Sequence, residues 1–342
     1  MSICGFEPRF IDRVEEINAL KDWCSDFRGI PLYIYGPEGC GKTRLLREFV
    51  RKFNDFFGDN AVAVYIDALE RSSVSEALYS SPKVKILENV IRILVERFIG
   101  QGVGKVLADN ISTILEKAIA RKKYENSYIL IVVDDVVKAI GLNRIEWYVK
   151  WLYELMWKLA EKYRPKSINF IVTTSEGISL DLVTRHRHSA VYLIWNLDRE
   201  GFEELFYELN PPSSISFEDI WKLLGGNPGK LIELAKRFKW NIEMMIREYT
   251  NSLERTIVEV MRMGLLEELK MIVEDIDALY SVSSPKMSKL EEMLVERNLI
   301  IYKKWSTISG DYVPPNREIG VGLYYAWQVP LYREVIAEII EK

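Results

Sequence analysis

Residues 36–43 combine glycines, a lysine and a hydroxyl side chain at a spacing suited to binding phosphate. They read GPEGCGKT and match the pattern G-x-x-x-x-G-K-[ST]. The glycines let the backbone curl so that successive N–H groups point at phosphate oxygens, and the start of the next helix adds partial positive charge. Lys42 would reach the β- and γ-phosphates, and the Thr43 hydroxyl would bind Mg²⁺. The nucleotide contacts predicted from this segment are Gly36, Pro37, Glu38, Gly39, Cys40, Gly41, Lys42, Thr43 and Arg44.

Two acidic residues follow an apolar run further along the chain, and their types suit a metal and an attacking water. Residues 128–133 read YILIVV and are followed by Asp134 and Asp135. Asp134 would hold Mg²⁺ through a water, and Asp135 would orient the water that attacks the γ-phosphate. Because an aspartate has a shorter reach than a glutamate, we predict slow hydrolysis. The alternative is a turn whose acids cap the following helix.

Two further segments carry groups that could read the γ-phosphate. Residues 173–175 read TTS at the end of an apolar run, and the Thr174 hydroxyl could hydrogen-bond the γ-phosphate or its water. The alternative is an ordinary strand threonine. Arg185 and Arg187 lie in the segment TRHRH and could contact the γ-phosphate in their own subunit or in a neighbouring one. The alternative there is a solvated basic turn.

The elements that must position these groups alternate along the first half of the chain. Short apolar runs typical of buried strands occupy residues 31–35, 61–66, 128–133, 169–174 and 190–194. Segments with helical spacing of apolar residues occupy 44–53, 81–121 and 145–163. Near-continuous apolar strands alternating with helices predict an α/β fold, with a parallel sheet covered by helices on both faces.

The second half of the chain changes to mostly helical patterns. Helical segments run through 197–249, with breaks at 211–214 and 225–229, and continue from 252 to 280. A helix, a strand, a polar loop, a second strand and a last helix follow to residue 340. This order suggests a winged helix. We therefore predict an ATPase-type domain at 1–195, a small helical lid at 196–251 and a winged-helix domain at 252–342.

Composition limits the class of protein and the compartment. The 342 residues include 46 Lys and Arg against 50 Asp and Glu, a formal net charge of −4, which argues against nonspecific nucleic-acid binding over the whole surface. Three cysteines without a C-x-x-C pair argue against a disulfide framework or a zinc finger and fit a reducing cytosol. Apolar runs are far shorter than the roughly 18 residues of a membrane span. We predict a cytoplasmic protein with no membrane role.

The net charge of the C-terminal module indicates whether it could bind DNA. From Arg255 to Lys342 there are 11 Lys and Arg against 14 Asp and Glu. Duplex binding draws much of its affinity from neutralising phosphates, which an acidic module does poorly. Some basic residues do gather near the expected recognition helix and wing: Lys286, Lys289, Arg297, Lys303 and Lys304. The balance favours a protein partner, or an autoinhibitory contact of this module with the first domain, over DNA.

Taken together, these motifs resemble those of the archaeal ATPase family, in the AAA+/STAND branch of P-loop NTPases, over essentially the whole chain. GPEGCGKT and ILIVVDD match its two Walker motifs, and FIDRVEEI at 10–17 is similar to its F-x-[DG]-R-x-x-E-[LI] opening. The resemblance implies that Phe10, Ile11 and Arg13 help to wrap the adenine. It also implies that Pro228, in GNPG, packs near the adenine. Arg187 falls where the family has a G-R pair, here His-Arg.

The resemblance and the motifs lead to one main expectation and two alternatives. We expect a protein that binds ATP or ADP with Mg²⁺, hydrolyses ATP slowly and acts as a nucleotide-gated conformational switch. One alternative is an ATP-gated DNA-binding regulator or a replication-initiator-like protein that uses the winged helix. The other is a scaffold that binds nucleotide without hydrolysis. Oligomeric state stays open, because arginines that act in trans need a neighbouring subunit and arginines that act in cis do not.

Overall fold

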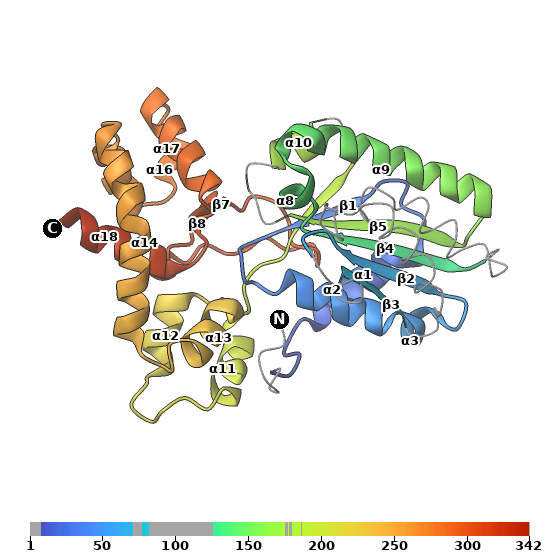
Figure 1. The fold of residues 1–342 in the computed structure, drawn as a ribbon, viewed down its shortest axis with the longest axis horizontal. Coiled ribbons are helices and arrows are strands. Elements are labelled where there is room, and N and C mark those ends of the chain that lie inside the picture. Colours follow the sequence, from blue (N-terminus) through green and yellow to red (C-terminus); the bar gives the residue numbers. More distant parts are fainter. Residues whose placement is uncertain are drawn as a thin grey trace. The chain divides into compact units, whose positions relative to one another are not determined.

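The chain folds into two compact units in the computed structural model (Figure 1), which describes residues 8–70, 77–81, 126–174, 177, 180–185 and 187–341. Unit 1 comprises Met1–Arg13, Gly36–Gly41 and Leu193–Lys342. Unit 2 comprises Val14–Tyr35 and Lys42–Tyr192. The glycine-rich part of the predicted phosphate loop therefore groups with unit 1, whereas Lys42 opens a helix of unit 2.

Unit 2 is built on a six-stranded sheet in the order β3-β2-β4-β5-β1-β6. Its strands are β1 (Leu32–Tyr35), β2 (Val62–Asp67), β3 (Leu78–Ser80), β4 (Tyr128–Asp134), β5 (Ser167–Thr174) and β6 (Ala190–Leu193). Strand β4 pairs in parallel with β2 and β5, and β1 pairs in parallel with β5. The central strands are buried along nearly their whole length, as expected for a parallel sheet with both faces covered.

Helices cover both faces of this sheet. They are α1 (Val14–Ser25), α2 (Lys42–Arg51), α3 (Phe53–Phe57), α8 (Val136–Ile140), α9 (Leu142–Tyr163) and α10 (Leu180–Thr184). Figure 1 has α1, α2 and α3 on one side of the sheet and α8, α9 and α10 on the other. The predicted α/β fold is confirmed. Strand β3, which lies antiparallel to β2 at the edge, was not predicted, because three residues carry no readable period. Apart from residue 81, the helical stretch predicted at 81–121 lies outside the described residues.

The long C-terminal part of unit 1 is mostly helical. Its helices are α11 (Arg199–Glu208), α12 (Phe217–Leu224), α13 (Pro228–Lys236), α14 (Ile242–Arg262), α15 (Leu266–Glu274), α16 (Ala278–Ser281), α17 (Pro285–Glu296) and α18 (Pro330–Glu341), with the 3₁₀ turn η2 (Arg317–Ile319). Strands β7 (Ile300–Tyr302) and β8 (Tyr325–Trp327) pair antiparallel. One apolar core joins residues from Leu197 to Ile336, and α14 runs through residue 252. The division into a lid and a winged helix stays a prediction.

A carboxylate fixes the start of β8 within unit 1. Asp277 accepts hydrogen bonds from the backbone N–H groups of Leu323, Tyr324 and Tyr325, the last two at 2.9 and 3.1 Å. A Cβ at Gly322 would lie 2.5 Å from Asp277 Oδ1, so glycine lets the carboxylate approach. Gln328 follows β8 directly, and this anchor therefore also sets its position.

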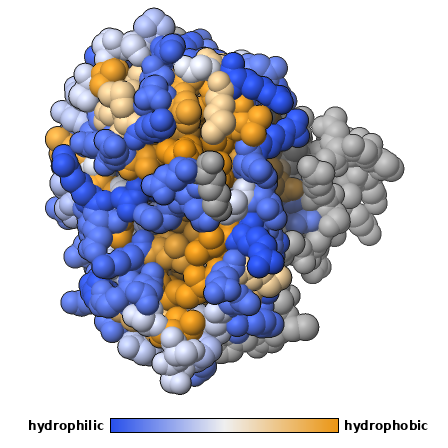
Figure 2. All heavy atoms as spheres, turned by 90° about the vertical axis from the view of Figure 1, so that its left-hand side faces the viewer, coloured by the Kyte–Doolittle hydropathy of each residue, from blue (hydrophilic) through white to orange (hydrophobic). Residues whose placement is uncertain are grey.

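Unit 1 exposes apolar side chains on the face that carries α14, α17 and α18. Figure 2 looks at this face, where apolar residues gather in two areas separated by a band of polar ones. The exposed apolar side chains of unit 1 include Tyr207, Met244, Val258, Met261, Met263, Met271, Tyr280, Tyr312 and Leu323. Within the described ranges, every helix is too short or too polar to cross a membrane.

Candidate functional site

Asp134 ends β4 in unit 2, and its carboxylate collects three hydroxyl groups. Thr43 Oγ1 donates to Oδ2 at 2.6 Å, Tyr65 donates to the same oxygen, and Thr173 donates to Oδ1. Asp134 is only 2% exposed. Burial of a carboxylate without partners would be costly, and the three donors compensate for the lost water. The cluster exists because the parallel strands β2, β4 and β5 end at the same edge of the sheet, where α2 begins.

The hydroxyl that contacts Asp134 from β5 belongs to Thr173, the neighbour of the Thr174 predicted to contact the γ-phosphate. Side chains alternate across a strand, so only one of two neighbouring threonines can face this carboxylate. Thr173 also accepts the backbone N–H of Asp135 at 2.9 Å. Thr174 is buried at the last position of β5. Its predicted contact with the γ-phosphate stays a prediction.

Asp135 follows β4 in a left-handed backbone conformation, with φ of 52°. It stands at the N-cap position of α8, yet its side chain makes no capping hydrogen bond to that helix. The helix-capping alternative therefore has no support in the structure. The N–H bond to Thr173 holds the Asp135 backbone beside Asp134.

Hydrogen bonds to its carbonyl oxygens hold the glycine-rich part of the phosphate loop in unit 1. Arg13 donates from Nη2 to the carbonyl oxygens of Cys40, at 2.8 Å, and Trp195, at 2.7 Å. The N–H of Gly229, in the first turn of α13, donates to the Gly39 carbonyl at 3.0 Å. Cys40 is buried and its thiol donates to the Ile194 carbonyl at 3.5 Å. With these carbonyls occupied, other parts of unit 1 hold the loop backbone in place.

Three buried amide side chains form a ring around the backbone of Glu38. Gln328 Oε1 accepts the Glu38 N–H at 2.8 Å, and Asn227 Nδ2 donates to the Glu38 carbonyl at 2.9 Å. Asn196 closes the ring, because its Oδ1 accepts from Asn227 at 3.0 Å and its Nδ2 donates to the Gln328 carbonyl at 3.4 Å. We call Asn196, Asn227 and Gln328 the amide ring. It links the loop to the segment between β8 and α18.

Two glycines are required by close backbone approach at this loop. A Cβ at Gly36 would lie 2.0 Å from the Ile194 carbonyl oxygen. A Cβ at Gly229 would lie 2.8 Å from Gly39 Cα and 2.9 Å from the Gly39 carbonyl oxygen. Neither neighbour is a flexible side chain that could move aside. The GNPG segment thus packs directly on the phosphate loop.

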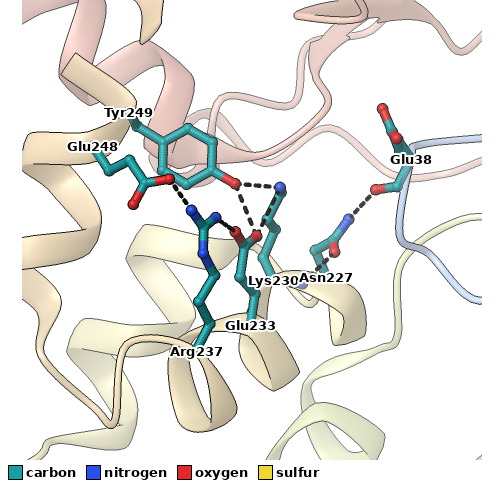
Figure 3. A network of polar contacts seen from close by, with 7 residues as sticks. All are labelled: Glu38, Asn227, Lys230, Glu233, Arg237, Glu248 and Tyr249. Carbon is teal, nitrogen blue, oxygen red and sulfur yellow. Dashed lines mark hydrogen bonds and ion pairs between the residues drawn. The ribbon is translucent and has the colours of Figure 1, made fainter. Parts of the chain in front are cut away.

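A polar network holds α13 against α14 (Figure 3). Lys230 donates to Glu233 Oε2 at 3.0 Å and to the Tyr249 hydroxyl, and Arg237 bonds both Glu233 and Glu248. Burial alone would raise the pKa of Glu233, but Lys230 and its other donors hold it below the ordinary value. The Asn227 side chain caps α13 by accepting the Lys230 N–H at 3.0 Å. The network therefore steadies the helix whose first turn contacts the loop.

The remaining predicted site residues are spread over both units. Lys42 is buried and Arg44 is half-buried in the first turn of α2. In unit 1, Ile11 belongs to the apolar core, and Pro228 occupies the first turn of α13. Phe10 is half-buried in unit 1, and Arg187 is exposed in unit 2.

The oxygen atoms around Asp134 fit a magnesium ion. Mg²⁺ prefers oxygen ligands, keeps several waters and is usually held by one or two carboxylates together with substrate phosphates. Thr43 supplies a hydroxyl and Asp134 a carboxylate, 2.6 Å apart. Across the described ranges, no group of three or more His, Cys, Asp or Glu side chains could hold a metal without such outside ligands. An ion bound here would take its other ligands from water and phosphate.

Several known proteins are similar to this chain in sequence or fold. A family described as "ATPase domain predominantly from Archaea" matches residues 10–234. An uncharacterized ATP-binding protein of Pyrococcus abyssi is 22% identical over 293 residues, which make up 83% of this chain and 82% of that protein. Another, from Methanocaldococcus jannaschii, is 21% identical over 330 residues and 87% of each chain. A Walker-type ATPase of P. abyssi shares the fold, with a TM-score of 0.52 and 15% identity over 97% of this chain and 99% of that one.

Proposed function

The chain belongs to the family of ATPase domains found predominantly in Archaea, and from this premise we propose that it binds ATP with Mg²⁺, hydrolyses it slowly and switches conformation with the nucleotide. Its relatives are ATP-binding proteins, and the first motif matches the phosphate-binding pattern in full. In this proposal the loop N–H groups and Lys42 bind the phosphates, while Thr43 and Asp134 hold the metal.

Hydrolysis would use Asp135 to orient the attacking water. Its backbone is tied beside Asp134 through Thr173, which supports a role close to the metal. The short aspartate side chain is the reason to expect a low rate. Bound Mg²⁺ would supply charge stabilisation for the transferred phosphoryl group. Thr174 and Arg187 are retained as proposed γ-phosphate contacts.

The contacts of Glu38 carry the proposal of a switch. Phosphate binding would use N–H groups of the loop, and the same backbone is already hydrogen-bonded to Gln328, Asn227 and Arg13. A shift of the loop backbone would therefore alter hydrogen bonds of the amide ring. Such a change would reach β8 and α18 through Gln328, all within unit 1.

A single series of measurements tests binding, hydrolysis and switching. Binding of a fluorescent ATP analogue and steady phosphate release are expected in wild type and abolished in Lys42→Ala. Lys52→Ala, which changes an exposed lysine beyond the end of the same helix, should behave as wild type. Hydrogen exchange at residues 36–41 and 323–329 should differ between ATP and ADP. Nucleotide binding without phosphate release would support the alternative of a scaffold that does not hydrolyse ATP. Identical hydrogen exchange with ATP and ADP would refute the proposed conformational switch.

The charge pattern of the C-terminal region supports a protein partner rather than DNA. Lys289 and Arg297 pair with Glu292 and Glu259 at 2.7 and 2.6 Å. Lys286 donates to the Gly264 carbonyl at 2.9 Å. Lys303 is buried and donates to the Val313 carbonyl at 2.7 Å, and its burial lowers its pKa to about 8. Lys304 stands over the Tyr324 ring, 5.1 Å from its centre. All five basic residues that had suggested DNA binding are thus engaged within the protein.

The exposed apolar face of unit 1 gives such a protein partner a surface. Large, flexible methionines such as Met261 and Met271 are common at adaptable protein-binding surfaces. A gel-shift titration with labelled duplex at low salt, with and without ATP, discriminates the two partners. We expect no shift, whereas a salt-dependent shift would restore the DNA-binding alternative.

A further inference from the structure

Tyr65 lies beside the proposed metal site, and no motif points to it. It sits in β2, is fully buried, and its hydroxyl donates to Asp134 Oδ2, the oxygen that also accepts from Thr43. Burial first, and then the negative charge of Asp134, raise the pKa of Tyr65 well above the ordinary tyrosine value. The geometry makes the hydroxyl a hydrogen-bond donor to this carboxylate.

Arg47 holds Tyr65 from the phosphate-loop helix. It lies in α2, one turn after Thr43, and its guanidinium stands 5.1 Å from the centre of the Tyr65 ring. A positive charge over the ring polarises the Tyr65 O–H group and strengthens its hydrogen bond to Asp134. Burial alone would lower the pKa of Arg47, but Tyr65, Asp67 and Asp134 raise it, so the charge is held in place.

Asp67 completes the arrangement at the end of β2. In the parallel pairing of β2 with β4, Asp67 stands directly opposite Asp134. Its Oδ2 binds Arg47 at 3.2 Å, and its Oδ1 accepts the Leu69 N–H at 3.0 Å. Asp67 thus orients Arg47, Arg47 orients Tyr65, and Tyr65 orients Asp134.

We propose that Tyr65, supported by Arg47 and Asp67, is a positioning residue that aims the Asp134 carboxylate for magnesium bound with the nucleotide. When Thr43 turns its oxygen to the metal, Tyr65 and Thr173 still hold one oxygen each of Asp134. The carboxylate then does not need to be reoriented for each binding event. This inference rests on the proposed binding of Mg²⁺ and ATP, and it names the residues that set the metal affinity of that site.

The test separates metal affinity from nucleotide affinity. Binding of a fluorescent ATP analogue is measured first in EDTA and then as Mg²⁺ is added. Tyr65→Phe keeps the ring and removes only the hydroxyl. We expect its half-saturating Mg²⁺ concentration to rise about tenfold, with affinity in EDTA unchanged. Asp67→Asn should produce a smaller rise, because it loosens Arg47 and leaves the Tyr65 hydroxyl.

Tyr33→Phe is the matched control, because it removes a buried tyrosine hydroxyl from β1 that has no hydrogen-bond partner among the described residues. Equal behaviour of Tyr65→Phe and wild type would overturn the inference, as would equal shifts in Tyr65→Phe and Tyr33→Phe. If Tyr65→Phe does not fold by circular dichroism, Asp67→Asn decides alone, because its side chain is partly exposed. An unchanged magnesium requirement in that variant then overturns the inference. A wild type that binds no nucleotide, or binds it without any effect of Mg²⁺, refutes the proposed function itself and the inference with it.

Discussion

The protein holds its phosphate loop and its acidic strand end by different physical means. Around Glu38, three neutral amides and backbone groups of unit 1 make ordinary hydrogen bonds. Around Asp134, hydroxyl donors and the Arg47–Asp67 pair of unit 2 surround a buried charge. The first arrangement fixes the shape of the loop, and the second fixes the direction of a charge. Changes at the amide ring should therefore act with or without metal, and changes around Asp134 should act through the metal.

The largest effect is expected from Asp134→Ala. The variant removes the carboxylate and leaves the hydroxyls of Thr43, Tyr65 and Thr173 without their acceptor. Magnesium-dependent ATP binding and phosphate release should fall by about 100-fold or more, since outer contacts alone account for 10–100-fold in metal sites. Titration of Mg²⁺ against bound analogue measures this. A loss that is equally large in EDTA would mean that the loop itself depends on Asp134, and would break the contrast.

A smaller but metal-independent effect is expected from Gly229→Ala. The new methyl group would stand 2.8 Å from Gly39 Cα, so the loop or the start of α13 must move. Overpacking of this kind costs about 1–3 kcal/mol, or about tenfold or more in ATP affinity if it is taken from the bound state. The same factor should appear in EDTA and in Mg²⁺. Wild-type affinity in both would mean that the close packing is not needed for binding.

Gln328→Leu should have a moderate effect of the same kind. It leaves the Glu38 N–H without its acceptor, which costs about 1–3 kcal/mol for a buried group. Urea unfolding should register this loss of stability, and ATP affinity should fall severalfold without any change in the magnesium requirement. A changed magnesium requirement would contradict the separation of the two regions.

The smallest effect concerns salt. The Arg47–Asp67 pair is partly exposed, so 0.5 M salt should screen it, whereas neutral amide bonds are insensitive to ionic strength. We expect the ratio of half-saturating Mg²⁺ between Asp67→Asn and wild type to move towards one as salt rises, by about twofold. The affinity ratio between Gln328→Leu and wild type should stay constant. If the ratio of half-saturating Mg²⁺ between Asp67→Asn and wild type does not change with salt, the Arg47–Asp67 pair does not act through its charges.

Much of the sheet and the phosphate loop could be predicted, because their signals are local. Strand-length apolar runs gave β1, β2, β4, β5 and β6, and the spacing of residues 36–43 placed the loop between β1 and α2. The groups that surround these motifs could not be predicted in the same way. Tyr65 and Thr173 reach Asp134 through strand pairing. Thr173 rather than Thr174 makes the contact because its side chain lies on the same face of the sheet as the Asp134 carboxylate.

The amide ring was beyond the sequence for a different reason. Gln328 lies 290 positions after Glu38, and nothing in its neighbourhood distinguishes it from a surface glutamine. The side chain of Asn196 bridges Asn227 and Gln328, and no local pattern in the sequence indicates this role. Contacts of this range depend on the packing of whole segments, which local patterns do not encode.

The rate at which Cys40 is alkylated would measure how often the phosphate loop opens. Its thiol is buried and hydrogen-bonded to the Ile194 carbonyl oxygen. An alkylating reagent can therefore reach the thiol only when this part of the loop moves away from Ile194. The rate of modification, followed by mass spectrometry of the peptide, then counts opening events in the unlabelled native chain. Cys24 offers an internal reference, because it is buried in unit 2 and burial raises the pKa of its thiol. A nucleotide that keeps the loop closed would slow the alkylation of Cys40. Alkylation measured during ATP turnover would show how often the loop opens in each catalytic cycle.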